Sequence, residues 1–207
     1  MNFDQRTTRE LIQAIADTVI GNAGELTELD RAIGDADHGV NLERGFKAVL
    51  AKIDAISALR INEALNEVGK TLILSVGGAS GPLYGKLFAT VGQHLTNPDQ
   101  LAKERVIVAC EQAINVIKAL GRSDVGHKTM LDVLVPSLDQ LRAGDGASSM
   151  QAVRERAHAA ALETVPMIAR SGRASFLGER SRGHMDPGAR SSELIVAAVC
   201  HFLEARL

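Results

Sequence analysis

Three aspartates close together in the sequence are the residues best suited to chemistry. Asp30, Asp35 and Asp37 lie within eight positions, and Gly34 and Gly39 interrupt helical continuity among them. A compact turn here would bring the three carboxylates together, where they repel one another unless a cation neutralises them. Ligands made only of oxygen favour Mg²⁺ or Ca²⁺ over zinc, which prefers nitrogen and sulfur.

The spacing of these residues excludes an EF-hand. A calcium loop starting at Asp35 would put Val40 at the invariant glycine position and Phe46 at the bidentate glutamate position. Mg²⁺ usually takes one or two protein carboxylates and completes its shell with substrate phosphates. Two interpretations therefore stay open on spacing alone: a pair of Mg²⁺ ions on a nucleotide, or a solvated acidic turn that caps the next helix.

A glycine-rich turn, GGASGP over residues 77–82, is a candidate anion site. Glycines let backbone N–H groups approach phosphate oxygens, and a following helix adds partial positive charge. We expect Ser80 to cap that helix and Pro82 to lie in its first turn. The turn is not a Walker A loop, because Leu87 stands where Ser or Thr is required. The alternative is a turn whose glycines only permit close helix packing.

Residues 171–190 form a long polar segment that could cover such a site. Loops of this length are uncommon in compact domains and are usually functional. The segment carries four arginines against two acidic residues, while Phe176 and Leu177 indicate that part of it packs down. We interpret it as a lid-like loop over a phosphate-rich site, with a solvated loop as the alternative. Of the six histidines only His38, beside the carboxylates, is singled out, as a donor to phosphate.

Helical periodicity predicts an all-α protein. No stretch alternates cleanly enough to predict a strand, and Gly21 and Gly24 predict a kink in the first helix. Pro136 and Pro166 are expected to bend the helices that contain them, and residues 97–99 predict a turn. The apolar pattern gives eight helices, at about 7–29, 41–53, 62–76, 82–95, 99–119, 128–142, 148–170 and 191–206.

Short links between these helices predict an antiparallel up-and-down bundle or barrel. In that topology the connections after the first, third, fifth and seventh helices share one end. These connections are the Asp30–Asn41 turn, the 77–82 turn, the 121–126 loop and the 171–190 segment. The candidate chemistry is therefore expected to gather at one rim.

Composition restricts the class of protein. The 207 residues show no compositional boundary, so we expect a single domain over 1–207 with a core of aliphatic side chains. A net charge of −2 gives no reason to expect nucleic acid or an anionic membrane as a partner. The N-terminus is too polar for a signal peptide, and no apolar run approaches membrane-spanning length. We expect a cytoplasmic protein whose two cysteines are reduced.

Several of these motifs together resemble one known family. The runs GDADHGVN (34–41), SVGGASGPL (75–83), GRASFLGER (172–180) and GHMDPG (183–188) resemble the nucleotide-binding L subunit of bacterial dihydroxyacetone kinase. A free-standing L chain is similar to the system that depends on the phosphoenolpyruvate phosphotransferase relay. The resemblance implies a barrel of eight antiparallel helices with the nucleotide at one end.

The resemblance also implies roles for individual residues. By that analogy Asp30, Asp35 and Asp37 hold two Mg²⁺ ions that bridge the phosphates. Arg173 is the expected catalytic residue, because it would stabilise the charge of the transferred group. The expected nucleotide contacts are His38, Gly39, Val40, Asn41, Ala79, Ser80, Gly121, Met130, Arg173, Met185, Asp186, Pro187 and Gly188.

The implied activity is phosphoryl transfer shared among subunits. Bound ADP would be rephosphorylated by a phosphohistidine M subunit, and the ATP formed would phosphorylate dihydroxyacetone on the K subunit. Such transfer needs positioning and charge neutralisation more than a general base, so none is assigned on this chain. Two alternatives are a stand-alone short-ketose kinase subunit with exchangeable ATP and an ADP-dependent partner of a transcription regulator.

Overall fold

The computed structural model describes residues 3–96, 102–144 and 147–206, and all regular structure in these ranges is helical. The predicted turn at 97–99 and the predicted start of a helix at 99 lie outside these ranges. The elements are α1 (Gln5–Gly21), α2 (Ala23–Ile33), α3 (His38–Leu50), α4 (Ile53–Ser57), α5 (Ile61–Ser75), α6 (Ser80–His94), α7 (Lys103–Gly121), α8 (Leu131–Ala143), α9 (Ala147–Glu163), the 3₁₀ helix η1 (Arg173–Ser181) and α10 (Pro187–Glu204).

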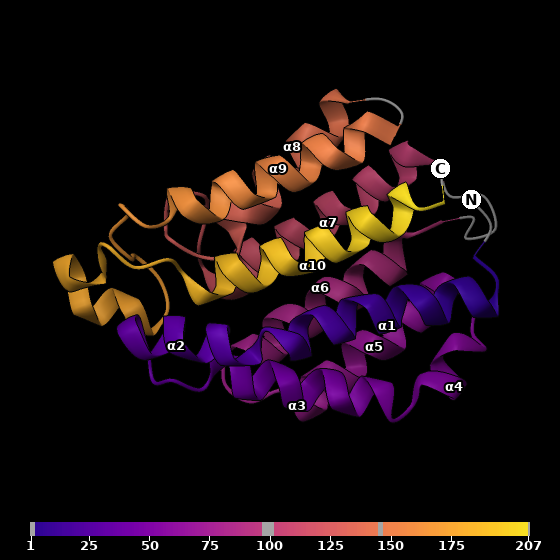
Figure 1. The fold of residues 1–207 in the computed structure, drawn as a ribbon, viewed down its shortest axis with the longest axis horizontal. Coiled ribbons are helices and arrows are strands. Elements are labelled where there is room, and N and C mark those ends of the chain that lie inside the picture. Colours follow the sequence, from indigo (N-terminus) through magenta and orange to yellow (C-terminus); the bar gives the residue numbers. More distant parts are fainter. Residues whose placement is uncertain (1–2, 97–101, 145–146, 207) are drawn as a thin grey trace.

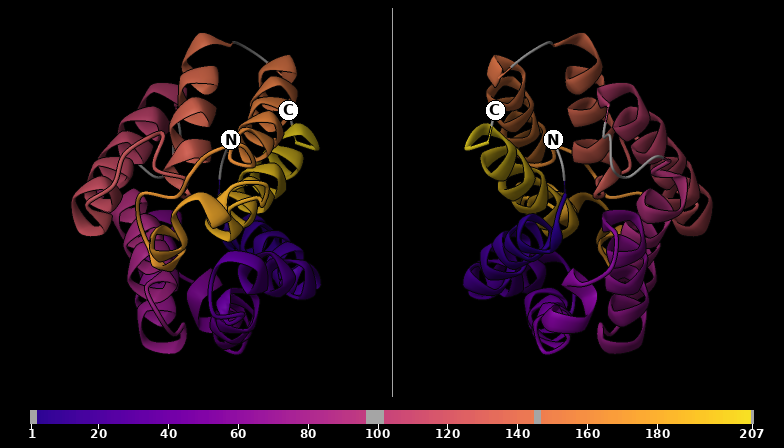
Figure 2. Two further views of the ribbon diagram at one scale, coloured as in Figure 1. Left: turned by 90° about the vertical axis from the view of Figure 1, so that its left-hand side faces the viewer. Right: turned by 90° about the vertical axis from the view of Figure 1, so that its right-hand side faces the viewer.

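Eight long rods form a closed ring within the described part of the chain. The broken rod α1–α2 packs on α3, and the order continues through α5, α6, α7, α8, α9 and α10, which returns to α1 (Figures 1 and 2). The short helix α4 is an addition that packs on α1 and α5. The prediction of an all-α, up-and-down barrel of eight helices is confirmed.

The first rod is broken where the glycines predicted a kink. Residue Asn22 ends α1, its N–H bonding to the Val19 carbonyl and its side chain to the Thr18 carbonyl at 2.7 Å. The chain then restarts as α2, which continues to Ile33 rather than ending near 29. This extension places Asp30 inside a helix, with its side chain largely buried.

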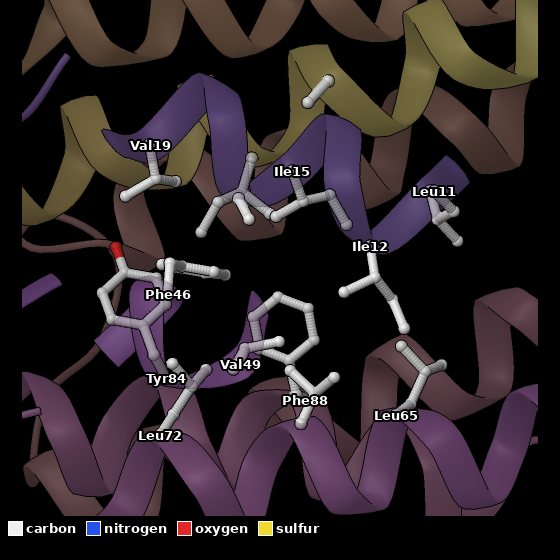
Figure 3. Close-up of a cluster of buried hydrophobic side chains, with 14 of the residues drawn as sticks. Leu11, Ile12, Ile15, Val19, Phe46, Val49, Leu65, Leu72, Tyr84 and Phe88 are labelled. Atoms are coloured by element: carbon white, nitrogen blue, oxygen red, sulfur yellow. The ribbon is translucent and has the colours of Figure 1, made fainter. Parts of the chain in front are cut away.

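The core is a continuous cluster of aliphatic side chains inside the ring, as the composition predicts (Figure 3). Phe46 of α3 and Phe88 of α6 meet edge to face, with ring centroids 6.2 Å apart. Tyr84 lies at one end of the cluster and Leu65 at the other (Figure 3). Burial of each such side chain stabilises the fold by about 1.5–3 kcal/mol.

Two helix boundaries around the predicted lid differ from expectation. Helix α9 ends at Glu163 and not near 170, because Pro166 disfavours a helical conformation in the residue before it. Helix α10 begins at Pro187 and not at 191, because the Asp186 carboxylate caps it by accepting the Ala189 N–H at 2.7 Å. The connection between these helices therefore covers residues 164–186, begins and ends earlier than predicted, and is partly ordered as η1.

Two helices on the other side of the rim also begin at residues other than those predicted. Helix α8 begins at Leu131 and not at 128, because Gly126 and Lys128 both have positive φ. Helix α6 begins at Ser80, with Ala79 in the capping position, so Ser80 is not the cap that we predicted. Among the described helices, none combines the length and apolar character needed to cross a membrane.

Candidate metal and anion site

The three aspartates meet at the end of the barrel that carries α2 and η1 (Figure 1). One carboxylate oxygen from each of Asp30, Asp35 and Asp37 lies within 4.8 Å of the others. The turn folds back over the end of α2, because Asp30 Oδ2 accepts the N–H groups of Asp37 at 2.8 Å and His38 at 3.2 Å. Ala36 has φ 62°, a left-handed conformation that is unfavourable for a residue other than glycine. This conformation allows so short a loop to close.

Glycine is required on both sides of this turn. A Cβ at Gly34 would lie 2.8 Å from Cγ of Asp30, so a side chain there would push that carboxylate out of place. A Cβ at Gly39 would lie 2.8 Å from the Thr27 backbone nitrogen, so the start of α3 packs directly on α2. The glycines that indicated a turn in the sequence thus leave the space that the turn needs to bring the three carboxylates together.

The donor set fits a divalent cation. Three oxygen donors at this spacing suit Mg²⁺, which takes few protein ligands and leaves positions for phosphate oxygens. The adjacent histidine adds no nitrogen ligand, because both ring nitrogens of His38 contact serine hydroxyls. One protein cation already faces the cluster: Nη2 of Arg173 lies 3.1 Å from Oδ2 of Asp35. This contact brings the predicted catalytic arginine to the predicted metal ligands.

The glycine-rich turn lies against the carboxylate turn, as the predicted topology required. A Cβ at Gly78 would lie 3.9 Å from Oδ2 of Asp37 and 3.8 Å from Nδ2 of Asn41. The Asn41 side chain is largely buried and accepts a 2.7 Å hydrogen bond from Arg44. The first N–H groups of α6 therefore begin beside the three carboxylates, where an anion bridged to a cation would be stabilised.

His38 is placed differently from the sequence-based expectation. Its ring is buried, with Nδ1 3.0 Å from Ser80 Oγ and Nε2 2.9 Å from Ser191 Oγ. Burial lowers the pKa of the imidazole, and the nearby charges of Asp30 and Asp37 oppose that shift. Both ring nitrogens therefore contact protein hydroxyls, one at the start of α6 and one on α10.

Two of the expected nucleotide contacts, Met130 and Gly121, lie in different places. Met130 precedes α8, is buried, and lies beside the 185–188 turn, since a Cβ at Gly188 would be 3.5 Å from the Met130 nitrogen. Gly121 ends α7 next to α6, with Leu83 3.8 Å from its Cβ position. Val40, at the start of α3, and Ala79, just before α6, are exposed.

Sequence reasoning missed a buried ionisable group behind Met130. The Lys128 ammonium donates to the carbonyl oxygens of Met167 at 3.1 Å and Ser181 at 2.5 Å. Burial raises the pKa of Asp186 to about 7, Asp132 adds to the increase, and Lys128 opposes it. Asp186, which the sequence analysis expected to contact the nucleotide, is buried and caps α10.

Fold and site together define a class: a helical barrel with a carboxylate cluster and a glycine-lined helix N-terminus at one end. The family model described as the DAK2 domain matches residues 32–201. This match covers most of the sequence, including Asp35, Asp37 and the rim turns, and it begins two residues after Asp30. The chain belongs to the DAK2 domain family.

Two curated relatives are similar over most of their length. The ADP-binding subunit DhaL of the PEP-dependent dihydroxyacetone kinase of Escherichia coli K12 is 43% identical over 171 residues, covering 80% of this chain and 81% of the relative. The ADP-binding subunit DhaL of the PTS-dependent dihydroxyacetone kinase of Lactococcus lactis is 36% identical over 186 residues, covering 90% and 91%.

A solved structure shares the fold. The crystal structure of the dihydroxyacetone kinase of C. freundii, in complex with AMP-PNP and Mg²⁺, matches with a TM-score of 0.76 at 24% identity. The match covers 97% of this chain and 34% of the other, so this chain spans about a third of that longer protein. At this identity the likeness supports the helical barrel itself.

Proposed function

We propose that this chain is the nucleotide-binding subunit of a dihydroxyacetone kinase, in which bound ADP is rephosphorylated by a phosphohistidine subunit. The observation that carries the proposal is the meeting of Asp30, Asp35 and Asp37 oxygens within 4.8 Å, beside the start of α6. Relatives named as ADP-binding subunits support the nucleotide, and a related structure containing AMP-PNP and Mg²⁺ supports the metal.

We expect different residues at the rim to bind different parts of the nucleotide. Asp30, Asp35 and Asp37 would hold two Mg²⁺ ions, whose charge would neutralise and bridge the phosphate oxygens. The N–H groups and hydroxyl at the start of α6 would bind the same phosphates. Gly121 and Met130 would line the adenine side, and the 185–188 turn would belong to the lid over it. Arg173 would supply further positive charge to the transferred group.

Partner subunits complete the proposed reaction. Phosphoryl transfer requires alignment and charge neutralisation, and the acceptor oxygen comes with the partner. In this proposal a phosphohistidine M subunit donates to ADP, and a K subunit presents dihydroxyacetone to the ATP formed. The relatives' names, which refer to PEP- or PTS-dependent kinases, support this relay over a self-sufficient kinase. We place the reaction in the cytoplasm.

Titration calorimetry of ADP in the presence of Mg²⁺ tests the proposal. Asp35→Ala should abolish measurable Mg·ADP binding, because it removes a ligand whose side chain makes few other contacts. Asp17→Ala is the matched control, since Asp17 is an exposed aspartate on α1 that bonds only to Gln13 among the described contacts. Unchanged affinity in Asp35→Ala would reject the metal assignment.

Nucleotide retention separates the relay from its alternative. If ADP is a resident cofactor, the purified protein should keep it through desalting, and mass analysis should identify it. A site that empties on desalting and exchanges ATP rapidly would instead favour a stand-alone kinase subunit with exchangeable nucleotide.

A further inference from the structure

A buried chain of hydrogen bonds connects α10 to the rim. Ser192 Oγ lies 2.9 Å from the Tyr84 hydroxyl, which lies 2.6 Å from Ser191 Oγ. Ser191 Oγ lies 2.9 Å from Nε2 of His38, and Nδ1 of His38 lies 3.0 Å from Ser80 Oγ. Four of these side chains are buried, and only Ser80, at the end of the chain, is partly exposed.

The inner part of the chain is anchored to backbone. The Tyr84 hydroxyl oxygen lies 3.1 Å from the Gly188 carbonyl oxygen, and Ser191 Oγ lies 2.9 Å from the Pro187 carbonyl oxygen. Burial raises the pKa of Tyr84 to about 12, so the phenol keeps its proton. Figure 3 shows Tyr84 at the end of the apolar cluster, so the core fixes its ring. The imidazole of His38 is thus held from behind by a rigid support.

The outer end of the chain is the first residue of α6. Without a partner, the Ser80 hydroxyl would populate several rotamers at the exposed start of the helix. The contact with Nδ1 of His38 selects one of them. A hydroxyl offers one donor and two acceptor positions. With Nδ1–H of His38 donating to Ser80 Oγ and Nε2 accepting from the Ser191 hydroxyl, Ser80 keeps its own proton for a phosphate oxygen.

We propose that His38 is a positioning residue, whose ring fixes the Ser80 hydroxyl for contact with the nucleotide phosphates. The inference rests on the proposed function. Fixing this hydroxyl before binding removes an entropic cost that the ligand would otherwise bear. The geometry assigns Ser191 and Tyr84 the task of holding the ring, and assigns His38 no direct contact with the phosphates.

Two substitutions separate the two contacts of the ring. The amide nitrogen of asparagine falls near the position of histidine Nδ1, and that of glutamine falls near Nε2. His38→Asn can therefore keep the contact with Ser80, whereas His38→Gln keeps the contact with Ser191 and loses Ser80. The proposal expects His38→Gln to weaken Mg·ADP binding by at least about threefold, the cost of selecting one of three rotamers. The loss should not exceed that of Ser80→Ala, about 10- to 100-fold for one hydrogen bond to a charged group. His38→Asn should weaken binding less than His38→Gln.

A double-mutant cycle with Ser80→Ala distinguishes positioning from general stability. If His38 acts through Ser80, His38→Gln should cause no further loss of Mg·ADP affinity in the Ser80→Ala protein. Adenosine, measured by competition, should bind equally well to all variants because it lacks phosphates. Losses that multiply in the double variant, or an equal loss for adenosine, would overturn the inference.

A milder variant provides a second test in case His38→Gln does not fold. Tyr84→Phe keeps the ring packing and removes one support of the chain, so it should give a smaller loss that also disappears in the Ser80→Ala background. Persistence of the Tyr84→Phe loss in that background would count against the inference. A wild-type protein that binds no Mg·ADP would reject the proposed function as well, whereas binding with multiplicative losses would reject the positioning role alone.

Discussion

At the scale of single residues, the rim is arranged so that one arginine can change partners. The ion pair between Arg173 and Asp35 is exposed, since 70% of the arginine side chain is accessible to solvent. Exposed pairs of this kind contribute about 0–1 kcal/mol. The guanidinium can therefore leave Asp35 for a phosphate group at little cost.

Replacement of Arg173 should affect transfer more than binding. In Arg173→Gln we expect the rate of phosphoryl transfer, measured with the partner subunits, to fall by about 10- to 1000-fold. The affinity for Mg·ADP should change by less than about threefold, because the carboxylates and α6 carry the ground-state binding. Arg180→Gln, at an exposed position of the same helix η1, is the control. Equal losses of rate and affinity would reject the role of Arg173 in transfer.

The sequence predicted contacts between neighbours and missed contacts between distant residues. The three aspartates lie within eight positions, so the glycines around them were enough to predict a shared turn. The His38 ring is held by Ser80, 42 residues away, and by Ser191, 153 residues away. No local pattern encodes such pairs, so the sequence predicted His38 as a donor to phosphate but did not predict its contacts with the two serines.

At the scale of elements, the segment after α9 is fixed to the barrel at both ends. The cluster of Ile33, Ala169 and Ala174 packs η1 against the end of α2. On the other side Lys128, buried behind the loop before α8, donates to two backbone carbonyls of this segment. Lys128 is therefore the polar anchor of the predicted lid.

Loss of this anchor should loosen the lid. Lys128→Met leaves two carbonyl groups without their donor, so we expect the free energy of unfolding to fall by about 1–3 kcal/mol. Trypsin should cleave the segment at Arg180 and Arg182 faster than in the wild type. Lys86→Met, at an exposed position of α6, should change neither quantity. An unchanged cleavage rate in Lys128→Met would show that the lid is held by other contacts.

The capping residue of α10 should make stability depend on pH. Burial raises the pKa of Asp186 to about 7, whereas an aspartate in the unfolded chain has a pKa of about 3.9. Between these values the folded state retains a proton that the unfolded state has released. The stabilisation is therefore complete below about pH 4 and is lost as the pH rises through 7, by at most about 1.4 kcal/mol per pH unit.

Asp186→Asn tests this dependence because asparagine is also a good helix cap. Urea denaturation between pH 4.5 and pH 8 should show a flatter dependence of unfolding free energy in the variant than in the wild type. Equal dependence in both proteins would mean that Asp186 ionises alike in the folded and unfolded states.

Helix periodicity was a reliable guide to the elements, but it did not fix their ends. The eight rods were predicted because apolar residues recur at helical spacing along each. The starts of α8 and α10 were placed wrongly because backbone geometry and capping decide them: positive φ at Lys128, and the carboxylate of Asp186. Both are local interactions, but they depend on single residues instead of a repeating pattern.

At the scale of the whole molecule, stability and function are separated along the barrel. The site lies at one end, with the core extending away from it (Figures 1 and 3). Leu65 is buried at the end of the core cluster far from Tyr84. A cavity there should weaken the fold without disturbing the rim.

Leu65→Ala should lower the free energy of unfolding by about 2–5 kcal/mol, as measured by urea denaturation. At a temperature where the variant is still folded, its affinity for Mg·ADP should equal that of the wild type. A loss of affinity in the folded variant would show that the core and the rim are coupled.

Chain topology explains why the position of the site was predictable. In an up-and-down ring every second connection returns to the same end, so loops far apart in sequence must meet there. The contacts between the turns of Gly78 and Asp37, and between Arg173 and Asp35, confirm this convergence. The sequence could not predict how the loops pack against one another, because that depends on the buried side chains behind them.

A crystal structure grown with ADP and Mn²⁺ tests the central claim most directly. Mn²⁺ prefers the same oxygen ligands as Mg²⁺ and is located by its anomalous scattering. The account predicts anomalous peaks among the carboxylates of Asp30, Asp35 and Asp37, with the diphosphate between them and the start of α6. A nucleotide bound elsewhere, or three carboxylates that hold no ion while ADP is present, would contradict it.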